Sequence, residues 1–318
     1  MKRRDTLLLP LAAAWAGSAF AQIGNAPVRI LVGAPAGGST DTLARSLAVS
    51  MGPALGRTVI VENRPGAGGN IAADAVAKAA PDGNTLLMSF TSHAINATLY
   101  PTLPFDPVKD FTALTCVATS PSILVAHPSV PAKDVRELIA LAKAKPGQLN
   151  FAIGAVGSSL HMAGEAFKMQ SGVDIVNIPY KGTSPAVQDV LAGQVQLMFA
   201  AVGNVKAHIQ AGKLKALGVT TAKRLPAFPS VPAIAEALPG YESSAWFGLF
   251  GPAHMPAERV RQIGDAARNA LQQADMRQRL ETEGAIPVGN STKQFSAFVQ
   301  SEITRWAQVV KFSGAKPE

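Results

Sequence analysis

The sequence is poor in cysteine and in aromatic side chains, and both shortages restrict what the chain can do. Cys116 is the single cysteine among 318 residues, which excludes an internal disulfide framework, a cysteine-based zinc site and an iron–sulfur cluster. Aromatic residues make up 6% of the chain, and no run rich in lysine and arginine alternates with them, so the net charge of +8 does not indicate a nucleic-acid-binding surface. The five histidines never stand four residues apart, and we expect neither a metal nor a cofactor.

Long apolar runs are also missing, apart from one near the N-terminus. Basic residues at positions 2–4 precede an apolar run from Leu7 to Trp15, which is well short of the roughly 20 residues that a membrane span needs. Ala19-Phe20-Ala21 then has the small-x-small pattern of a secretory cleavage site, so we expect a signal peptide over residues 1–21, cleaved after Ala21. The paired arginines leave twin-arginine export open, but Asp5-Thr6 after them favours the general route.

Short apolar runs alternate with segments of helical period along most of the chain. This pattern is typical of α/β proteins, in which crossover helices connect the strands of a sheet. The chain is too long for one small core, so two lobes are expected, and a second α/β block near Asp134 looks inserted into the first. Strands are expected at 28–33, 58–61, 85–90, 111–126 with an interruption at Pro121, 149–153, 174–178, 195–200, 215–219 and 241–250. Helices are expected at 40–55, 70–80, 134–145, 256–283 and 292–312, and after each of the strands at 149–153, 174–178 and 195–200.

Three glycine-containing loops follow expected strands and open expected helices. They are Gly33 to Asp41, Gly154 to His161 and Tyr180 to Pro185. Backbone N–H groups at a helix start lack partners and the helix dipole is positive there, so such loops suit an anion. The first loop has the spacing of a nucleotide P-loop, but Ser39 stands in place of the lysine, which argues against triphosphate binding.

The capping residues of these helices leave a simpler alternative open. Ser39 or Thr40 suits the N-cap of the first helix, in which case the loop is only a tight strand-to-helix turn. Ser184 suits the N-cap of the third helix, with Pro185 at the next position, where a missing N–H costs nothing. Asp41 would stabilise a helix start through the dipole, yet its carboxylate would repel an anionic ligand if it pointed into a cleft.

Two serine–histidine pairs raise the question of catalysis. Ser158 lies three residues before His161, and Ser92 adjoins His93. Neither serine stands in a Gly-x-Ser-x-Gly turn, and no nearby acid is evident to orient either histidine. Capping or packing histidines are therefore favoured over a catalytic pair.

Other side chains are candidates for the walls of a binding cleft. Tyr180, Trp246 and Phe247 could supply apolar walls for a ligand's carbon skeleton, with core packing as the alternative and favoured for Phe247. Lys181 could pair with a ligand carboxylate or point to solvent. The excess of basic side chains would favour encounters with anionic solutes.

Six motifs follow one another in an order that identifies a family. They are Val28 to Asp41, Val61 to Asn70 with its string Glu-Asn-Arg-Pro-Gly-Ala-Gly-Gly, Ala80 to Thr85, Pro104 to Pro107, Tyr180-Lys181-Gly182 and Phe228 to Pro232. In these motifs the chain resembles the Bug family, the periplasmic solute receptors of tripartite tricarboxylate transport systems. The resemblance covers nearly the whole mature chain.

This resemblance implies an α/β protein of the two-lobed type II periplasmic binding fold, a Venus flytrap with a mixed sheet flanked by helices in each lobe and two crossover segments. Residues 22–122 and 246–318 would form the first lobe, and 123–245 the second. The protein would capture a small carboxylate ligand between the lobes, through ordered waters and backbone N–H groups, and deliver it to membrane transporter subunits. It would lie in the periplasm, act as a monomer, bind no nucleic acid and catalyse no reaction.

The expected ligand-binding residues combine the resemblance with the loop and wall candidates above. In the first lobe they are Ala36, Gly37, Gly38, Ser39, Thr40, Thr91, Ser92 and His93, with Phe247 at the wall. In the second lobe they are Val156, Gly157, Ser158, Ser159, His161, Tyr180, Lys181, Gly182, Thr183 and Ser184.

A shortage of acidic residues in the second-lobe loops restricts the chemical class of the ligand. The second-lobe loops contain no Asp or Glu, and the strand end Phe199 to Gly203 is apolar, so nothing there would accept an ammonium group. We therefore expect a carboxylate without an amino group, either aromatic or dicarboxylic. Two alternatives stay open: an exported hydrolase that uses a Ser/His pair on an ester or amide, and a ligand sensor for a signalling partner.

Overall fold

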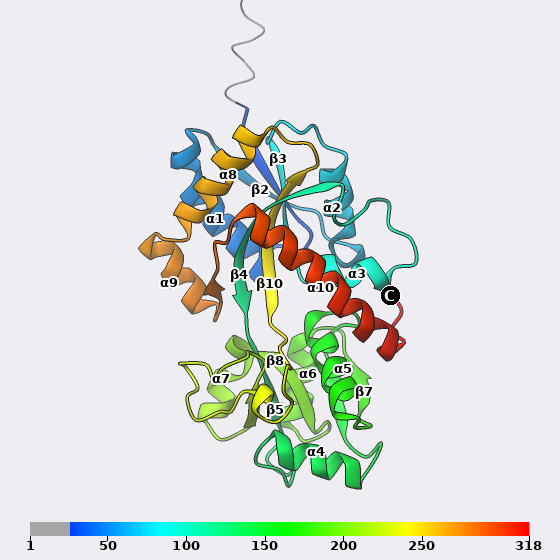
Figure 1. Ribbon diagram of the computed structural model, residues 1–318. Helices are drawn as coiled ribbons and strands as arrows, with labels where there is room; N and C mark the ends of the chain where they lie inside the picture. The colour runs from blue at the N-terminus through cyan, green and yellow to red at the C-terminus, as the bar shows by residue number, and fades with distance from the viewer. Residues whose placement is uncertain (1–25, 318) are drawn as a thin grey trace, which may run out of the picture.

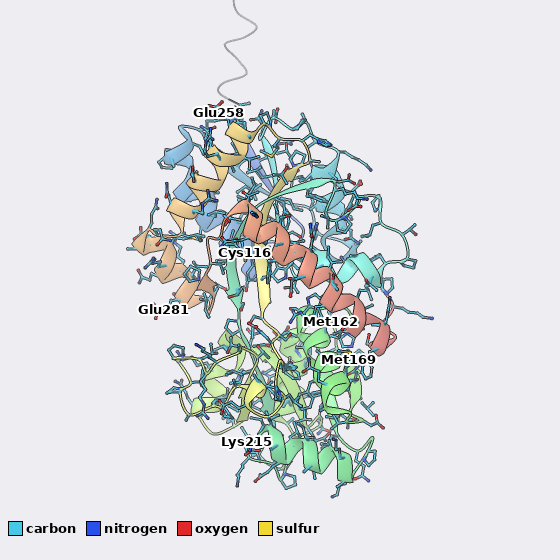
Figure 2. All side chains as sticks on the ribbon, viewed as in Figure 1. Cys116, Met162, Met169, Lys215, Glu258 and Glu281 are labelled. Carbon is cyan, nitrogen blue, oxygen red and sulfur yellow. The ribbon has the colours of Figure 1, made fainter. Side chains whose placement is uncertain are left out.

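A computed structural model of the chain describes residues 26–317, and the expected signal peptide with its cleavage after Ala21 lies outside this range. The described chain forms two lobes, each built on its own β-sheet (Figure 1). In Figure 2, Glu258 marks the far end of the first lobe and Lys215 lies in the second. No helix between residues 26 and 317 is both long enough and apolar enough to cross a bilayer.

The first lobe contains a six-stranded mixed sheet in the order β11-β4-β10-β3-β1-β2. Strands β1, β2 and β3 run parallel, and β10 runs antiparallel to both β3 and β4. The bounds are β1 (Val28–Val32), β2 (Val59–Asn63), β3 (Thr85–Phe90), β4 (Phe111–Ser120), β10 (Ala245–Pro252) and β11 (Ile286–Pro287).

Helices cover both faces of this sheet. Because side chains alternate along a strand, Ile30 packs with α1 and α8 on one face, whereas Leu31 packs with α2, α3 and α10 on the other. One face carries α1 (Ser39–Leu55), α8 (Ala257–Ala270) and α9 (Ala274–Thr282). The other carries α2 (Asn70–Ala77), which follows a 3-10 turn (Ala67–Gly69), α3 (Ser92–Leu99) and α10 (Thr292–Ser313).

The second lobe contains a five-stranded mixed sheet in the order β7-β6-β8-β5-β9. Strands β6, β7 and β8 run parallel, and β5 lies antiparallel between β8 and β9. The strands are β5 (Ser122–Ala126), β6 (Asn150–Ile153), β7 (Val176–Pro179), β8 (Leu197–Ala201) and β9 (Lys215–Val219). The helices are α4 (Val135–Ala144), α5 (Ser159–Ser171), α6 (Thr183–Leu191) and α7 (Val202–Gln210), with a 3-10 turn (Ile234–Glu236).

Two segments of chain cross between the lobes, and one helix bridges them. Pro121 separates β4 from β5, and residues 220–244 return the chain from β9 to β10. Helix α10 starts on the first sheet and ends beside α5 of the second lobe, near the labelled Met162 and Met169 (Figures 1 and 2). At this junction the buried indole N–H of Trp246 donates to Glu302 of α10 at 3.0 Å.

The two mixed sheets, their flanking helices and the break at Pro121 agree with expectation, but one predicted helix is divided in two and one helix was not predicted. The helix expected at 256–283 is broken between α8 and α9, because the change of direction lets Leu271 and Met276 both reach the core. The sequence gives no sign of α3, whose eight residues owe their helical state to the burial of Ala94, Ile95 and Leu99 rather than to propensity.

Candidate functional site

The carboxyl ends of the parallel strands in both lobes lie at the junction between the lobes. In the first sheet, Phe90 at the end of β3 pairs with Phe247, two residues after the chain enters β10. In the second sheet, Ala201 at the end of β8 pairs with Ser122, the first residue of β5. Because the neighbouring strands are parallel to β3 or β8, the loops after β1, β2 and β3 face those after β6, β7 and β8. Open α/β sheets bind ligands at such edges.

The loop after β1 presents the N-terminus of α1. Gly38 is the N-cap and Ser39 the first helical residue, so the prediction of Ser39 or Thr40 as the cap was wrong. Gly38 has no side chain to accept the first helical N–H groups. The amides of Ser39 and Thr40 therefore have no partner among residues 26–317, and Ala36, Gly37, Gly38 and Ser39 are exposed at the junction edge.

Asp41 holds this loop in place rather than facing a ligand. Its carboxylate accepts the Gly37 N–H at 2.9 Å, the Arg45 Nε–H at 3.0 Å and an amide hydrogen of Asn63 at 2.9 Å. Burial opposes ionisation, but the three donors together lower the pKa of Asp41. The charge of Asp41 is thus neutralised within its own lobe. The carboxylate therefore does not point into the junction, where it would repel an anionic ligand.

The loop after β2 packs closely against the loop after β1. A side-chain carbon on Gly33 would lie 2.7 Å from Gly69 Cα, so the two loops can touch only where glycine stands. Gly68 and Gly69 have φ angles of 63° and 97°, which other residues rarely adopt. The Asn96 side chain of α3 then donates to Gly68 O at 3.1 Å. The glycines of residues 66–69 therefore shape this edge of the first lobe.

The structure separates the three residues expected after β3. Thr91 is buried and paired with Trp246, because its Oγ1 accepts the Trp246 N–H at 2.8 Å and its own N–H donates to Trp246 O at 3.1 Å. His93 is also buried, with Nε2 2.8 Å from Pro107 O and the ring stacked on Phe250. Burial lowers the pKa of His93 to about 4, so it is neutral. Ser92, at the first position of α3, is also buried, at 8% exposed.

The loop after β6 is held by two residues of α5. Ser158 is the N-cap, and its Oγ accepts the His161 backbone N–H at 3.2 Å. The His161 ring Nδ1 accepts the Gly157 N–H at 3.0 Å. His161 is buried, whereas Ser158 and Ser159 are half-exposed and Val156 packs at the rim.

The loop after β7 borders a pocket of about 740 Å³, lined by Gly154, Ala155, Pro179, Tyr180, Lys181 and Gly182. Helix α6 begins at Thr183 with Gly182 as the N-cap, so the prediction of Ser184 as the cap was wrong. Gly182 adopts a φ of 115°, which turns the chain into the helix two residues early. Pro185 then lies inside the first turn, where an N–H is still not needed.

Of the two long side chains beside this pocket, Tyr180 is hydrogen-bonded within the lobe and Lys181 is exposed. Tyr180 donates its hydroxyl to Asp189 at 2.7 Å, and burial together with Asp189 raises the pKa of Tyr180 to about 12. Lys181 is exposed beside the pocket. No acid stands in the loop itself, yet helix α6 brings Asp189 to it from nine residues away. The i, i+9 separation gives no sequence signal of its own.

The expected wall residues of β10 belong to the core. Trp246 is fully buried and hydrogen-bonded to Thr91 and Glu302, so the prediction that it lines the cleft was wrong. Phe247 is 7% exposed and packs in the core between the first sheet and α1. Both residues face inward because the sheet they belong to is covered by helices on both faces.

Neither serine–histidine pair has the geometry of a nucleophile and its base. Ser158 Oγ accepts from the His161 backbone, while the ring nitrogens of His161 face Gly157 N–H and Glu165. His93 Nε2 is occupied by Pro107 O. A catalytic serine needs a ring nitrogen within hydrogen-bond reach of its hydroxyl, and neither pair provides it.

The donors that face the junction are therefore mainly first-turn amides. The N–H groups of Gly37, Gly157 and Gly182 donate within the chain, to Asp41, His161 and Gly154 O, so they are not free for a ligand. The helix starts of α1, α5 and α6 still present the amides of Ser39, Thr40, Ser159, Thr183 and Ser184 from the two lobes, with partial positive charge. Residues 26–317 contain no cluster of three or more His, Cys, Asp or Glu that could hold a metal ion.

Comparison with known proteins agrees with this architecture. The sequence model described as "Tripartite tricarboxylate transporter family receptor" matches residues 43–314. Among curated relatives, the protein BugT of Bordetella pertussis is 38% identical over 293 residues, which are 91% of this chain and 90% of BugT.

Solved structures give the same result. A Rhodopseudomonas palustris protein solved with adipate is 36% identical with a TM-score of 0.77, covering 92% of this chain and 98% of the other. MatC from Rhodopseudomonas palustris, with bound malate, is 36% identical with a TM-score of 0.74, covering 89% and 98%. These matches cover nearly the whole of both chains, and a further matched structure is that of a periplasmic transporter. They confirm the expected periplasmic binding fold.

Proposed function

Because this chain belongs to the tripartite tricarboxylate transporter receptor family, we propose that it captures a small carboxylate between its lobes and delivers it to a tripartite membrane transporter. Members of this family are periplasmic solute-binding receptors and not enzymes. We place this chain in the periplasm as a monomer, with residues 22–122 and 246–318 in one lobe and 123–245 in the other.

One observation supports the proposal most directly: helix N-termini from both lobes face the same junction without an arginine among their loops. Each helix start has a partial charge of about +0.5, and its first amides lack internal partners. An anion between them would receive hydrogen bonds from both lobes, so binding would favour closure. Bridging waters could extend the reach of these amides at little cost in free energy.

The ligand class we propose is a carboxylate without an amino group. Asp41 and Glu165 are buried and hydrogen-bonded within their own lobe, and Asp189 accepts the Tyr180 hydroxyl, so none of these three carboxylates is left unpaired for an ammonium group. Adipate and malate, which occupy the two related R. palustris structures, are dicarboxylates of this kind. Lys181, exposed beside the pocket, is placed to pair with a second carboxylate.

A thermal-shift series on the mature protein tests the proposal. Adipate, malate and aromatic acids would be compared with aspartate and glutamate at matched concentration. A ligand at a hundred times its dissociation constant should raise the free energy of unfolding by about 2.7 kcal/mol. Stabilisation by aspartate or glutamate alone would overturn the ligand class, and conversion of the ligand to product would overturn the assignment as a receptor.

A further inference from the structure

Beneath the loop after β6 lies a buried network that the ligand site does not use directly. Glu165 is 2% exposed, and its Oε1 lies 2.5 Å from Lys168 Nζ and 3.5 Å from His161 Nε2. The Asn177 side chain of β7 donates to the same oxygen at 2.6 Å. Burial opposes ionisation of Glu165, but His161, Asn177 and Lys168 lower its pKa, so the carboxylate is charged.

The hydrogen bonds determine which nitrogen of His161 carries the proton. Nδ1 accepts the Gly157 N–H at 3.0 Å, so Nδ1 must be unprotonated. Neutral imidazole then carries its proton on Nε2, the atom that faces the Glu165 carboxylate. Asn177 Nδ2 lies 3.3 Å from Nε2, but two donors cannot bond one another, and its short contact is with Glu165.

The peptide held by this network is the one that sets the direction of the loop. Gly157 has a φ of 74°, and its N–H would be unpaired without the His161 ring. The next residues are the N-cap Ser158 and the first helical amides of α5. From the other lobe, Leu99 packs on Gly157, since a side-chain carbon there would lie 2.5 Å from Leu99 Cδ2. Any rotation of this peptide would displace both the amides and the contact between lobes.

We propose that His161 and Glu165 are positioning residues of the ligand site: Glu165 keeps the imidazole proton on Nε2, so that Nδ1 accepts the Gly157 N–H and fixes the direction of the loop. This inference rests on the proposed function for its effect on affinity, but not for its geometry. It replaces the expectation that His161 touches the ligand with an indirect role, and it adds Glu165, which the sequence analysis did not select. Carboxylates that orient a histidine through its second nitrogen act in the same way at other protein sites.

Two substitutions at His161 distinguish this role from packing and from direct contact. In His161→Asn, the side-chain oxygen takes the place of Nδ1 and can still accept the Gly157 N–H, whereas in His161→Gln the polar end takes the place of Nε2. Affinity for the best-binding acid of the thermal-shift series would be measured by calorimetry. We expect His161→Gln to weaken binding about tenfold more than His161→Asn, because it leaves a buried N–H without its acceptor.

The other outcomes overturn the proposal. Equal losses in both variants would indicate packing alone, and a larger loss in His161→Asn would indicate that Nε2 contacts the ligand. Ser171→Ala is the matched control, since Ser171 is a buried residue of the same helix whose hydroxyl bonds only Phe167 O. It should leave affinity unchanged, and a loss there like that of His161→Gln would show that any disturbance of α5 weakens binding.

A measurement without ligand keeps the proposal testable if no carboxylate binds. Nitrogen-15 NMR of the wild-type chain should show the Nε2–H tautomer for His161, together with slow hydrogen exchange at the Gly157 amide. Glu165→Gln should speed that exchange about tenfold, equivalent to 1.4 kcal/mol. A proton on Nδ1, or unchanged exchange in Glu165→Gln, overturns the inference. Failure of every carboxylate to bind, with these signatures present, would instead overturn the proposed function.

Discussion

At the scale of single residues, two buried carboxylates hold the loops that face each other across the junction. Asp41 accepts the Gly37 N–H directly, and Glu165 acts on Gly157 through His161. In both cases a glycine amide that could serve a ligand is used inside the lobe. The donors left for the ligand are the helix amides that follow, whose directions these contacts fix.

Asp41→Asn tests the contribution of the first carboxylate to stability. The folded-state pKa of Asp41 is below its ordinary value of 3.8, so its contribution is full above that value and is lost as pH falls through the folded-state pKa. We expect the variant to unfold about 1–3 kcal/mol more easily at neutral pH, with the difference from wild type shrinking below about pH 4. Urea titrations at several pH values would measure this. Asp265→Asn, at an exposed pair with Arg268, should cost much less.

Gly154→Ala tests the close approach of the two second-lobe loops. An added carbon would lie 3.0 Å from Thr183 N and 3.1 Å from Gly182 C, both backbone atoms that cannot move aside easily. We expect a loss of about 1–3 kcal/mol in unfolding free energy, with weaker ligand binding because the α6 N-terminus is displaced. Gly164 lies inside α5, and a carbon added there would lie 3.7 Å from the rings of Phe151 and Phe199. Gly164→Ala should therefore be neutral or stabilising. Equal losses in both variants would contradict the argument.

At the scale of secondary-structure elements, the type of N-cap decides how many donors a helix offers. Helices α1 and α6 have glycine caps without a side-chain acceptor, so their first amides stay free. Helix α5 has Ser158 as its N-cap, which accepts the His161 N–H and leaves the amides of Ser159 and Leu160 without a side-chain acceptor. The helices that face the junction are thus capped less completely than α10, which has a full capping box at Ser291 and Gln294.

Ser158→Ala and Ser291→Ala form a matched pair for this point. Each removes a serine that accepts a first-turn amide, so each should cost about 1 kcal/mol of stability in a denaturant titration. Only Ser158 lies at the junction. We therefore expect weaker carboxylate binding in Ser158→Ala and unchanged binding in Ser291→Ala, and a similar loss of affinity in both would place the site elsewhere.

At the scale of the whole molecule, the lobes touch on two sides of the junction. Leu99 of α3 packs on Gly157, and the end of α9 at Glu283 approaches Gly203 at the start of α7. Helix α10 adds a third connection, since it packs against α3 in one lobe and α5 in the other (Figure 1). A ligand that bridges the lobes would add to these contacts rather than replace them.

Leu99→Ala tests the coupling between lobe contact and binding. Leu99 is 7% exposed and Leu55 is 8% exposed, so truncating either should cost about 2–5 kcal/mol of stability. Only Leu99 touches the other lobe. We expect weaker ligand binding and a larger radius of gyration by X-ray scattering in Leu99→Ala, with both unchanged in Leu55→Ala. Equal affinities in the two variants would show that this contact does not support closure.

The sequence by itself determined the strands, the glycine loops at their ends and the family, because these signals repeat within a few residues. Strand β9 and the break at Pro121 follow directly from apolar runs and a residue without an N–H. Local residue preference also agrees with Ser158 as the N-cap of α5. It failed at Gly38 and Gly182, where backbone conformation rather than a side chain starts the helix.

Only the tertiary structure decided which candidate side chains are free. Thr91 and Trp246 are 155 residues apart in the chain yet bond each other, and Asn63 reaches Asp41 across 22 residues. His93 and Phe247 are residue types that often line binding sites, but both side chains are buried in the core of the first lobe. A polar group's partner is fixed by the folded path of distant segments and by burial, and neither has a local period that a sequence pattern could reveal.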